Sequence, residues 1–447
     1  MFSRPLPPPQ LLALGMAGVI AAGTLLLLLP AAAAAGQSLG WSAAFFTATS
    51  AVCVTGLIVV DTPTAFSGFG QGVILLLIQI GGLGYMTVST LVAVMLGRRV
   101  SLGDRLLLQA SLNLASRRDL LRFVKTVTAL TLVAEAAGTV ILTLRWWPEF
   151  GFARASWLGL FHAVSAFNNA GFSLFSTSLV GWRSDVVVNL TVVILIVGGG
   201  IGYLTLTELG RARRWRTLSL HTRLVLVMTV VLLAGGTLAY YAIERTNPAT
   251  LGSLPAVEAG LAAAFQSVTT RTAGFNTLDI QALRPAALFI TLIFMFIGAG
   301  PGSTAGGVKV TTFGVTVLAL WATLQGRRDV TLFWRRLPLE LVGRSFLICL
   351  IGFLALNVVA GLLLAVEGRE LLPVLFEATS AFGTVGLSTG AAGAPVSLSA
   401  DFGTAGRLLV CLLMFVGRVG PLTMAFALAG RRPAARVRYP EERVLIG

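Results

Sequence analysis

The chain has 447 residues, of which 56% are hydrophobic and only 11% are charged. Soluble proteins carry about 25% charged residues because water must solvate their surface, so this composition excludes a soluble globular protein and indicates a membrane protein. The net charge of +15 does not indicate nucleic-acid binding, because the cations gather in short stretches beside long apolar runs and leave no basic soluble face.

The placement of these cations predicts how the chain is oriented. Most of the 33 Lys and Arg residues lie at Arg4 and in the stretches 98–125, 211–223, 327–344 and 431–443. By the positive-inside rule these stretches are cytoplasmic. We therefore expect a multi-pass protein of a bacterial-type inner membrane, surrounded by lipid, with both termini in the cytoplasm.

The N-terminal segment is predicted to be the first membrane-spanning helix. Its apolar run from Leu11 to Leu29 resembles the core of a signal peptide, but it exceeds the usual length of about 7–15 residues and is long enough to span a bilayer. The repeat pattern described next also requires this helix, so we expect it to be retained.

A short segment recurs four times, each time closed by a glycine and an apolar residue. The copies read FFTATSAVCVTGL at 45–57, LFHAVSAFNNAGF at 160–172, AAFQSVTTRTAGF at 263–275 and LFEATSAFGTVGL at 375–387. A Phe stands ten residues before the closing glycine in three copies. In the third copy Phe265 stands nine residues before Gly274, a departure of one residue. Such self-similarity indicates four copies of one structural unit.

Each segment is too short to cross a bilayer, and each is flanked by apolar runs that are long enough. A re-entrant loop is tolerated at membrane depth only where it lines water or protein, so four such loops are expected to meet on one axis. We predict an all-α membrane protein of four helix–pore-loop–helix repeats around one central pore, with eight spanning helices and four re-entrant half-helices. The predicted spans are 11–29, 72–96, 121–144, 187–209, 224–243, 287–320, 345–366 and 406–429. The repeats are assigned to residues 1–100, 101–215, 216–330 and 331–447.

The loops that close the segments have the chemistry of a filter for a monovalent cation. A ring of backbone carbonyls replaces the hydration shell of an ion, and glycine supplies the positive φ that turns carbonyls towards one axis. Each half-helix directs its negative dipole end towards the cation. The absence of an Asp or Glu ring argues against a divalent-cation filter. The predicted filter residues are Val54, Thr55, Gly56, Asn169, Ala170, Gly171, Thr272, Ala273, Gly274, Thr384, Val385 and Gly386.

A second glycine-rich motif recurs in the outgoing helices. It reads GGLGYMT at 81–87, GGIGYLT at 199–205, GAGPGST at 298–304 and GRVGPLT at 417–423. In the first two repeats we interpret its small residues as surfaces for close helix packing. In the third repeat, five glycines and a proline cannot hold a helix at costs of about 1 kcal/mol per Gly and about 3 kcal/mol for Pro, so we predict a break and an intramembrane loop at 298–307.

Arg418 occupies the corresponding place in the fourth repeat, as a lone arginine in an apolar helix. A buried arginine needs acceptors, and the unpaired carbonyls of a broken helix supply them. We predict that Arg418 holds the loop as part of a gate. The alternative is a packing kink with a purely structural arginine. The predicted gating residues are Gly298, Gly300, Pro301, Gly302, Ser303, Thr304, Gly306, Gly307, Lys309 and Arg418.

Two charged residues near the loops are predicted to support the filter from behind. Arg271, three positions before Gly274, cannot face the ion path without repelling a cation, so we expect its side chain to turn towards Glu258 or Glu377. Glu377 lies mid-way along the fourth half-helix, where an intramembrane carboxylate is costly and normally paired. We interpret the arrangement as a buried pair that braces the loop.

The segments TSAVCVTGL, AFNNAGF, TTRTAGF and TSAFGTVGL resemble the four filter loops of the Trk/Ktr/HKT superfamily of potassium transporters, and the likeness covers nearly the whole chain. The length and the ending RYPEERVLIG are most similar to the KtrB-type membrane subunit. The resemblance implies that the loop glycines and their preceding carbonyls coordinate K+, the transported ion. It also implies a homodimer on a cytosolic, nucleotide-binding regulatory ring of the KtrA type. Whether Na+ acts as an activator is left open.

Two other classes of function are weighed against this one. An alternating-access secondary transporter for another cation or solute also uses broken helices, but such proteins usually show two inverted halves rather than four parallel repeats. An intramembrane enzyme would need a nucleophile–base pair or a metal motif. The cysteines and histidines form neither, so we expect no enzymatic activity and no covalently bound cofactor; they are Cys53, Cys349, Cys411, His162 and His221.

Overall fold

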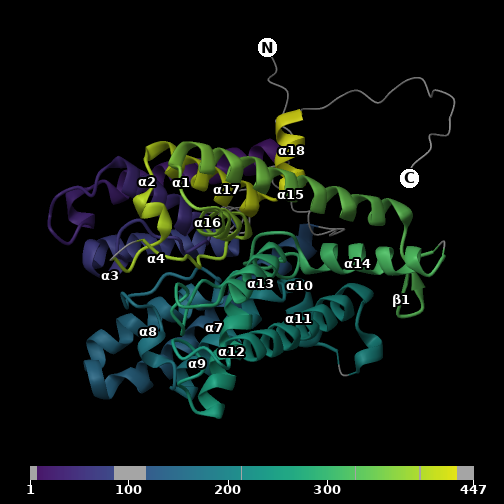
Figure 1. The fold of residues 1–447 in the computed structure, drawn as a ribbon, viewed down its shortest axis with the longest axis horizontal. Helices are drawn as coiled ribbons and strands as arrows, with labels where there is room; N and C mark the ends of the chain where they lie inside the picture. The colour runs from purple at the N-terminus through teal and green to yellow at the C-terminus, as the bar shows by residue number, and fades with distance from the viewer. Residues whose placement is uncertain (1–7, 85–116, 213, 328, 392–393, 430–447) are drawn as a thin grey trace.

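The computed structural model describes residues 8–84, 117–212, 214–327, 329–391 and 394–429. These residues are almost entirely helical (Figure 1). Within them, β-structure is limited to isolated bridges and one short hairpin, β1 (Thr331–Leu332) with β2 (Arg335–Arg336). The predicted all-α class is therefore confirmed.

The helices follow one pattern four times: an incoming helix, a short pore helix, then an outgoing helix. The incoming helices are α1 (Pro8–Leu27), α7 (Arg117–Phe150), α11 (Leu220–Glu244) and α15 (Leu339–Glu367). The pore helices are α2 (Trp41–Val52), α8 (Phe152–Phe167), α12 (Ala256–Thr269) and α16 (Leu371–Gly383). The outgoing helices begin with α4 (Gly68–Leu83), α9 (Val186–Gly200), α13 (Pro285–Phe296) and α17 (Thr404–Val419), and the single-turn α3 (Thr62–Ala65) precedes α4.

The pore helices are buried but too short to cross a membrane. The longest, α8, has 16 residues, which at 1.5 Å per residue gives about 24 Å against a hydrocarbon core of about 30 Å. A phenylalanine anchors each pore helix, and all four are fully buried: Phe46, Phe161, Phe265 and Phe376. Each repeat's incoming helix packs on its own pore helix, and α17 of the last repeat packs on α2 of the first. The first and last repeats thus lie side by side (Figure 1).

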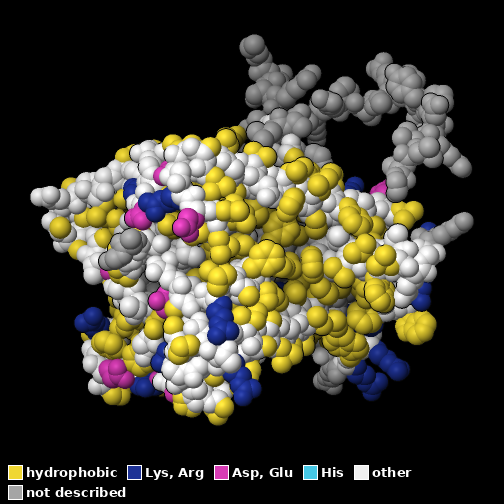
Figure 2. All heavy atoms as spheres, in the orientation of Figure 1, with side chains coloured by type: hydrophobic (Ala, Val, Ile, Leu, Met, Phe, Trp, Pro, Cys, Tyr) yellow, Lys and Arg dark blue, Asp and Glu magenta, His cyan; other side chains and the backbone are white. Residues whose placement is uncertain are grey.

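The outer surface is apolar. Among the described residues, four helices are long and apolar enough to cross a membrane (Pro9–Leu27, Val124–Phe150, Leu220–Glu244 and Leu339–Glu367), or five if the bent pair α9 and α10 (Tyr203–Leu209) counts as one span. Figure 2 shows hydrophobic side chains over much of one face, with charged groups mainly towards its edges. Such a surface fits lipid rather than water.

The outgoing helices are not continuous. The break predicted within 287–320 is present, but breaks also interrupt 187–209 and 406–429, which were wrongly predicted as unbroken spans. α9 meets α10 at 104°, α13 is separated from α14 (Val310–Leu324), and α17 is separated from α18 (Pro421–Ala429). The breaks after α9 and α17 coincide with glycines of the second motif in the left-handed region, with φ of 94° at both Gly202 and Gly420. The first outgoing run, 72–96, continues beyond the described residues.

The same motif also provides close packing, as predicted for the first two repeats. A Cβ added to Gly81 would collide with the carbonyl of Val52, and one added to Gly199 would collide with the carbonyl of Phe167. These glycines therefore let each outgoing helix approach the end of a pore helix. The motif combines close contact and a helix break within a few residues.

Candidate ion-permeation site

The four loop glycines form a closed ring. A Cβ added to Gly56 would lie 3.1 Å from the Cα of Gly171, and one added to Gly171 would lie 2.8 Å from the Cα of Gly274. A Cβ on Gly274 would lie 3.3 Å from the Cα of Gly386, and one on Gly386 would lie 3.1 Å from the Cα of Gly56. Each glycine therefore faces the next in chain order, and the last faces the first. The structure brings the four predicted loops onto one axis.

The loops share an unusual backbone conformation. The ring glycines have φ of 92°, 69°, 77° and 92°, a region that L-residues with a side chain seldom adopt. In each loop the residue two positions earlier is also left-handed, although it is not glycine: Val54 (56°), Asn169 (59°), Thr272 (73°) and Thr384 (50°). Such residues cost about 1–3 kcal/mol each and persist only where the surroundings hold them. Four copies of the same strain indicate that this geometry is needed to orient the carbonyls.

Hydrogen bonds to the preceding pore helix hold the strained loops. In the first repeat, Ser50 accepts from the amide of Gly56 through its hydroxyl (3.0 Å) and from the amide of Thr55 through its carbonyl (2.8 Å). Ser380 repeats both bonds in the fourth loop, at 3.0 and 2.8 Å. In the third loop the amide of Ala273 bonds to a carbonyl only four residues back, that of Thr269 (3.0 Å). The one-residue departure in the sequence is thus absorbed by a tighter turn.

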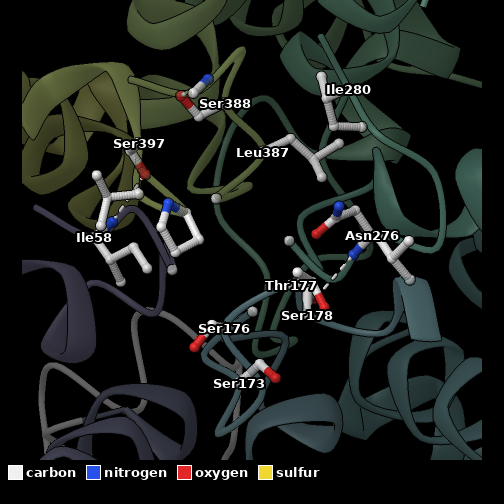
Figure 3. A pocket seen from close by; sticks show the side chains of 18 of the residues that line it. Ile58, Ser173, Ser176, Thr177, Ser178, Asn276, Ile280, Leu387, Ser388 and Ser397 are labelled. Atoms are coloured by element: carbon white, nitrogen blue, oxygen red, sulfur yellow. Dashed lines mark hydrogen bonds between the residues drawn. The ribbon is translucent and has the colours of Figure 1, made fainter. Parts of the chain in front are cut away.

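A cavity of about 380 Å³ lies on one side of the ring and is lined by the four ring glycines. Figure 3 shows serine, threonine and asparagine side chains around it, including Ser173, Ser176 and Asn276. Asp61 and Asp279 also line it, and no Lys or Arg is among the described lining residues. A cleft with one sign of charge raises the local concentration of the opposite ion, so this vestibule favours cations.

The segment between α13 and α14 lies against the filter. The predicted helix break is present, since α13 ends at Phe296 and α14 begins at Val310. A Cβ on Gly307 would lie 3.4 Å from the Cα of Gly383, and one on Gly306 would collide with the Thr384 side chain in the fourth filter loop. The predicted intramembrane loop is thus in contact with the fourth of the predicted filter loops.

Backbone hydrogen bonds fix this segment on the second repeat. The amide of Gly300 donates to the carbonyl of Gly200 (2.8 Å), and the amide of Tyr203 donates to the carbonyl of Gly302 (3.0 Å). The remaining predicted loop residues lie in the same segment, between Phe296 and Val310. Pro301 lies beside Gly202, Gly298 donates to the Val308 carbonyl, the Ser303 hydroxyl accepts from Ala305, and the Thr304 hydroxyl donates to Phe167.

Arg418 touches this segment, as predicted, but it does not hold it alone. Its guanidinium donates to the carbonyl of Thr304 and also to the carbonyl of Gly81 in α4. Lys309 donates to the carbonyl of Ala305 within the loop (2.5 Å). Arg418 therefore bridges the loop to the first repeat, a contact that the sequence did not predict.

The predicted pairing of Arg271 with Glu258 or Glu377 is wrong. Glu377 instead accepts hydrogen bonds from the Ser388 hydroxyl (2.6 Å) and from the Ser399 amide (3.0 Å) and hydroxyl (2.5 Å). Three donors satisfy this carboxylate without a cation. It ties α16 to the segment that follows the fourth filter loop. Arg271 instead lines a small cavity beside α9 and α11.

One buried polar cluster was not predicted from the sequence. The Glu135 carboxylate accepts from the Asn168 side-chain amide (2.8 Å) and from the Gln79 side-chain amide (3.1 Å). Asn168 directly precedes the second predicted filter loop, so this cluster fixes the residue from which that loop starts. The sequence did contain a signal, namely single polar residues within apolar runs. Such side chains are costly in lipid and therefore need hydrogen-bond partners.

The comparison with protein families agrees with this geometry. The family model described as "TrkH: Cation transport protein" matches residues 17–437. The chain belongs to the TrkH family of cation transport proteins. Members of this family are transporters, which points to a non-enzymatic role and to a multi-pass membrane protein.

Relatives within the TrkH family match along nearly the full length. The chain is 40% identical to "Ktr system potassium uptake protein B" of Bacillus subtilis, covering 98% of this chain and 97% of the relative. It is also 40% identical to the protein of the same name from Vibrio alginolyticus (98% and 95%) and 36% identical to "Potassium/sodium uptake protein NtpJ" of Enterococcus hirae (99% and 98%). The crystal structure of the potassium transporter TrkH from Vibrio parahaemolyticus has the same fold, with a TM-score of 0.74 at 18% identity over 93% of this chain and 83% of that one.

The role of Glu377 leads to a first prediction. Glu377→Gln should destabilise the protein by about 1–3 kcal/mol. In the variant the amide NH2 would face hydrogen-bond donors that, in the unmodified protein, donate to the Glu377 carboxylate. Thermal unfolding in detergent measures the effect. Glu367→Gln is a suitable control, since Glu367 accepts from the backbone amide of Gly403 (3.1 Å), a bond that is exposed. Equal unfolding midpoints for the two variants would show that Glu377 does not brace the filter loop.

Proposed function

We propose that this chain is the potassium-translocating membrane subunit of a Ktr-type uptake system, with channel-like permeation through a four-loop carbonyl filter. The observation that carries the proposal is the closed ring of four left-handed glycines, each preceded by the same strained backbone. A ring of carbonyls without a carboxylate suits a monovalent cation. The full-length relatives are named as potassium uptake proteins, and this is the substrate we assign.

The proposed architecture has eight spanning helices and four re-entrant half-helices, in repeats at 1–100, 101–215, 216–330 and 331–447. It is supported by the four short, buried pore helices and by outgoing helices that break at the same motif. In this arrangement both termini lie in the cytoplasm and the 380 Å³ vestibule opens to the outside of the inner membrane.

The proposed gate is the intramembrane loop 298–307 with Lys309 and Arg418. Its contacts with Thr384 and Gly383 support a position on the side of the filter opposite the vestibule. We further propose a homodimer that binds a nucleotide-binding regulatory subunit of the KtrA type on the cytosolic side. The name of the relatives, which places them in a Ktr system, supports such a partner.

Ion flux into proteoliposomes tests the proposal. We expect rubidium, as a substitute for potassium, to enter faster than sodium, and its entry to saturate without a second coupled solute. Runs with and without sodium show whether Na+ is an activator, as the name of the Enterococcus hirae relative suggests. Transport of an unrelated solute by alternating access, with no rubidium flux from correctly folded protein, would contradict the proposal.

The regulatory partner is expected to dock on a surface built from two basic stretches. Trp215 and Phe333 stack edge to face with centroids 6.4 Å apart, and the Arg223 guanidinium lies 6.0 Å from the Phe333 ring centre. These contacts join stretch 211–223 to the hairpin in 327–336. Trp334 at the hairpin tip is fully exposed, and an exposed Trp beside arginines is typical of a binding hot spot.

Trp334→Ala combined with Arg335→Glu should therefore weaken partner binding at least tenfold, because a hot-spot residue contributes about 2 kcal/mol or more. A pull-down with the purified regulatory subunit measures partner binding. The mass of the particle in mild detergent measures the oligomeric state. Arg154→Glu, on α8 and predicted to lie on the opposite side, is the matched control. Unchanged binding would exclude this docking face, and a monomeric particle would exclude the homodimer. The third basic stretch, 98–125, lies mostly outside the described residues.

A further inference from the structure

A small cavity lies between α9, α11 and α12, beside the proposed gating loop. Its volume is about 20 Å³. Its walls are apolar side chains and glycine backbone, with two exceptions, Arg271 from the end of the third pore helix and Thr229 from α11. Ala299, in the segment after α13, forms part of the same wall. The cavity therefore lies where the third filter loop, α11 and the proposed gate meet.

Both polar groups in the cavity wall lack partners. Arg271 and Thr229 are each only 6% exposed. The Nε of Arg271 and the hydroxyl of Thr229 make no hydrogen bond within the described part of the chain. A helix threonine normally bonds to the carbonyl four residues back, as Thr237 on the same helix does to Leu233 (2.8 Å). Thr229 does not, so its hydroxyl is left without an acceptor in the cavity wall.

The charge of Arg271 is also uncompensated. The ion pairs found among residues 8–84, 117–212, 214–327, 329–391 and 394–429 do not include Arg271. The C-terminal dipole of α12, next to it, supplies about half of a negative charge, which leaves the remainder unbalanced. An unpaired buried charge is strongly unfavourable, and a guanidinium can only donate hydrogen bonds. The site therefore calls for a bound acceptor that carries negative charge.

We propose that this cavity binds a single chloride ion, held by Arg271 and Thr229. A water molecule needs roughly 10–15 Å³ of such space, and the cavity has about 20 Å³, so it favours a single monatomic anion over the larger sulfate or phosphate. The ion would neutralise Arg271 close to the path of a cation and connect the third filter loop to the segment that contains Ala299. The site goes beyond the proposed function, because anion binding is measurable without any transport.

The thermal unfolding midpoint of the full-length chain, measured in detergent at constant ionic strength, tests the site. Replacing gluconate with chloride should raise the midpoint of the unmodified protein, while replacing gluconate with sulfate should not, because sulfate is too large for the cavity. Arg271→Gln and Thr229→Val should lose the response to chloride, and Thr229→Val keeps the test valid if Arg271→Gln does not fold. The Thr237 hydroxyl bonds within its own helix, so the control variant Thr237→Val should keep the response to chloride.

Rubidium flux into proteoliposomes gives a second readout. Removing chloride should reduce flux by roughly 3- to 30-fold, because a bare guanidinium would then repel cations in a medium of low effective dielectric constant. A midpoint that ignores chloride, or that responds equally in the unmodified protein and in both site variants, would overturn the proposal and leave a water molecule as the occupant. A chloride-dependent midpoint in a protein without rubidium flux would preserve the site and contradict the proposed function instead.

Discussion

Gly56→Ser is expected to lower the selectivity for potassium over sodium by about tenfold or more, which corresponds to about 1.4 kcal/mol. A Cβ at this position would collide with the carbonyl of Ala170 and lie 3.1 Å from the Cα of Gly171. Serine is also disfavoured at a φ of 92°. The carbonyl of Ala170 must therefore move, and a displaced carbonyl no longer replaces the hydration shell of potassium correctly. The ratio of rubidium to sodium flux in proteoliposomes measures the change.

Gly40→Ser separates this effect from general backbone strain. Gly40 precedes the first pore helix and has a φ of 85°, but a Cβ there would meet no atom within 4 Å. Both variants therefore carry a similar conformational cost, and only Gly56→Ser disturbs the ring. We expect Gly40→Ser to lose some stability and to keep the flux ratio. An unchanged ratio in well-folded Gly56→Ser would remove Gly56 from the filter.

The repeat unit could be predicted from the sequence because it depends on short-range patterns. Segment length relative to bilayer thickness separates a pore helix from a span, and a glycine at the same place in four loops predicts left-handed backbone there. The structure agrees at Gly56, Gly171, Gly274 and Gly386. The second left-handed position in each loop could not be predicted in this way. Its occupants, Val54, Asn169, Thr272 and Thr384, share no chemical feature, and the surrounding hydrogen bonds impose the conformation.

The wrong predictions concern two features: the pairing of charged residues between repeats, and the helix breaks at glycines of the second motif. Arg271 was paired with an acid by charge alone, but Glu377 finds three donors near its own loop and does not need a cation. The breaks after α9 and α17 are not predicted from the sequence. Close packing accounts for the motif in the second repeat and Arg418 for the motif in the fourth, and neither interpretation separates Gly202 or Gly420 from its neighbours. Hydropathy is insensitive to such a break, since the flanking halves are both apolar.

The gating proposal makes the second large prediction, that Arg418→Ala raises flux per folded protein. The structure assigns one hydrogen bond from Arg418 to the loop, at Thr304, and one to Gly81 in α4. A hydrogen bond from a charged group contributes about 1.5–3 kcal/mol, and a coupling energy of that size shifts an open–closed equilibrium by roughly 10- to 150-fold. Deleting residues 299–305 should also raise flux, and by a larger factor, because the deletion removes the loop's hydrogen bonds with Gly200 and Tyr203 as well.

Rubidium flux per folded protein, with the regulatory subunit present and absent, distinguishes a gate from a structural brace. The gate predicts higher flux, weaker control by the partner and an unchanged ratio of rubidium to sodium, because the filter ring does not include the loop. Arg407→Ala provides the matched control: Arg407 lies on the same helix and donates to the carbonyls of Ser399 (3.2 Å) and Ala400 (2.6 Å), away from the loop. If Arg418 only braces the fold, both variants should lose stability and flux together while regulation persists. A fall in flux with intact regulation in Arg418→Ala would therefore rule out the gate, because loss of its bond to Thr304 can only favour the open state if the loop closes the pore.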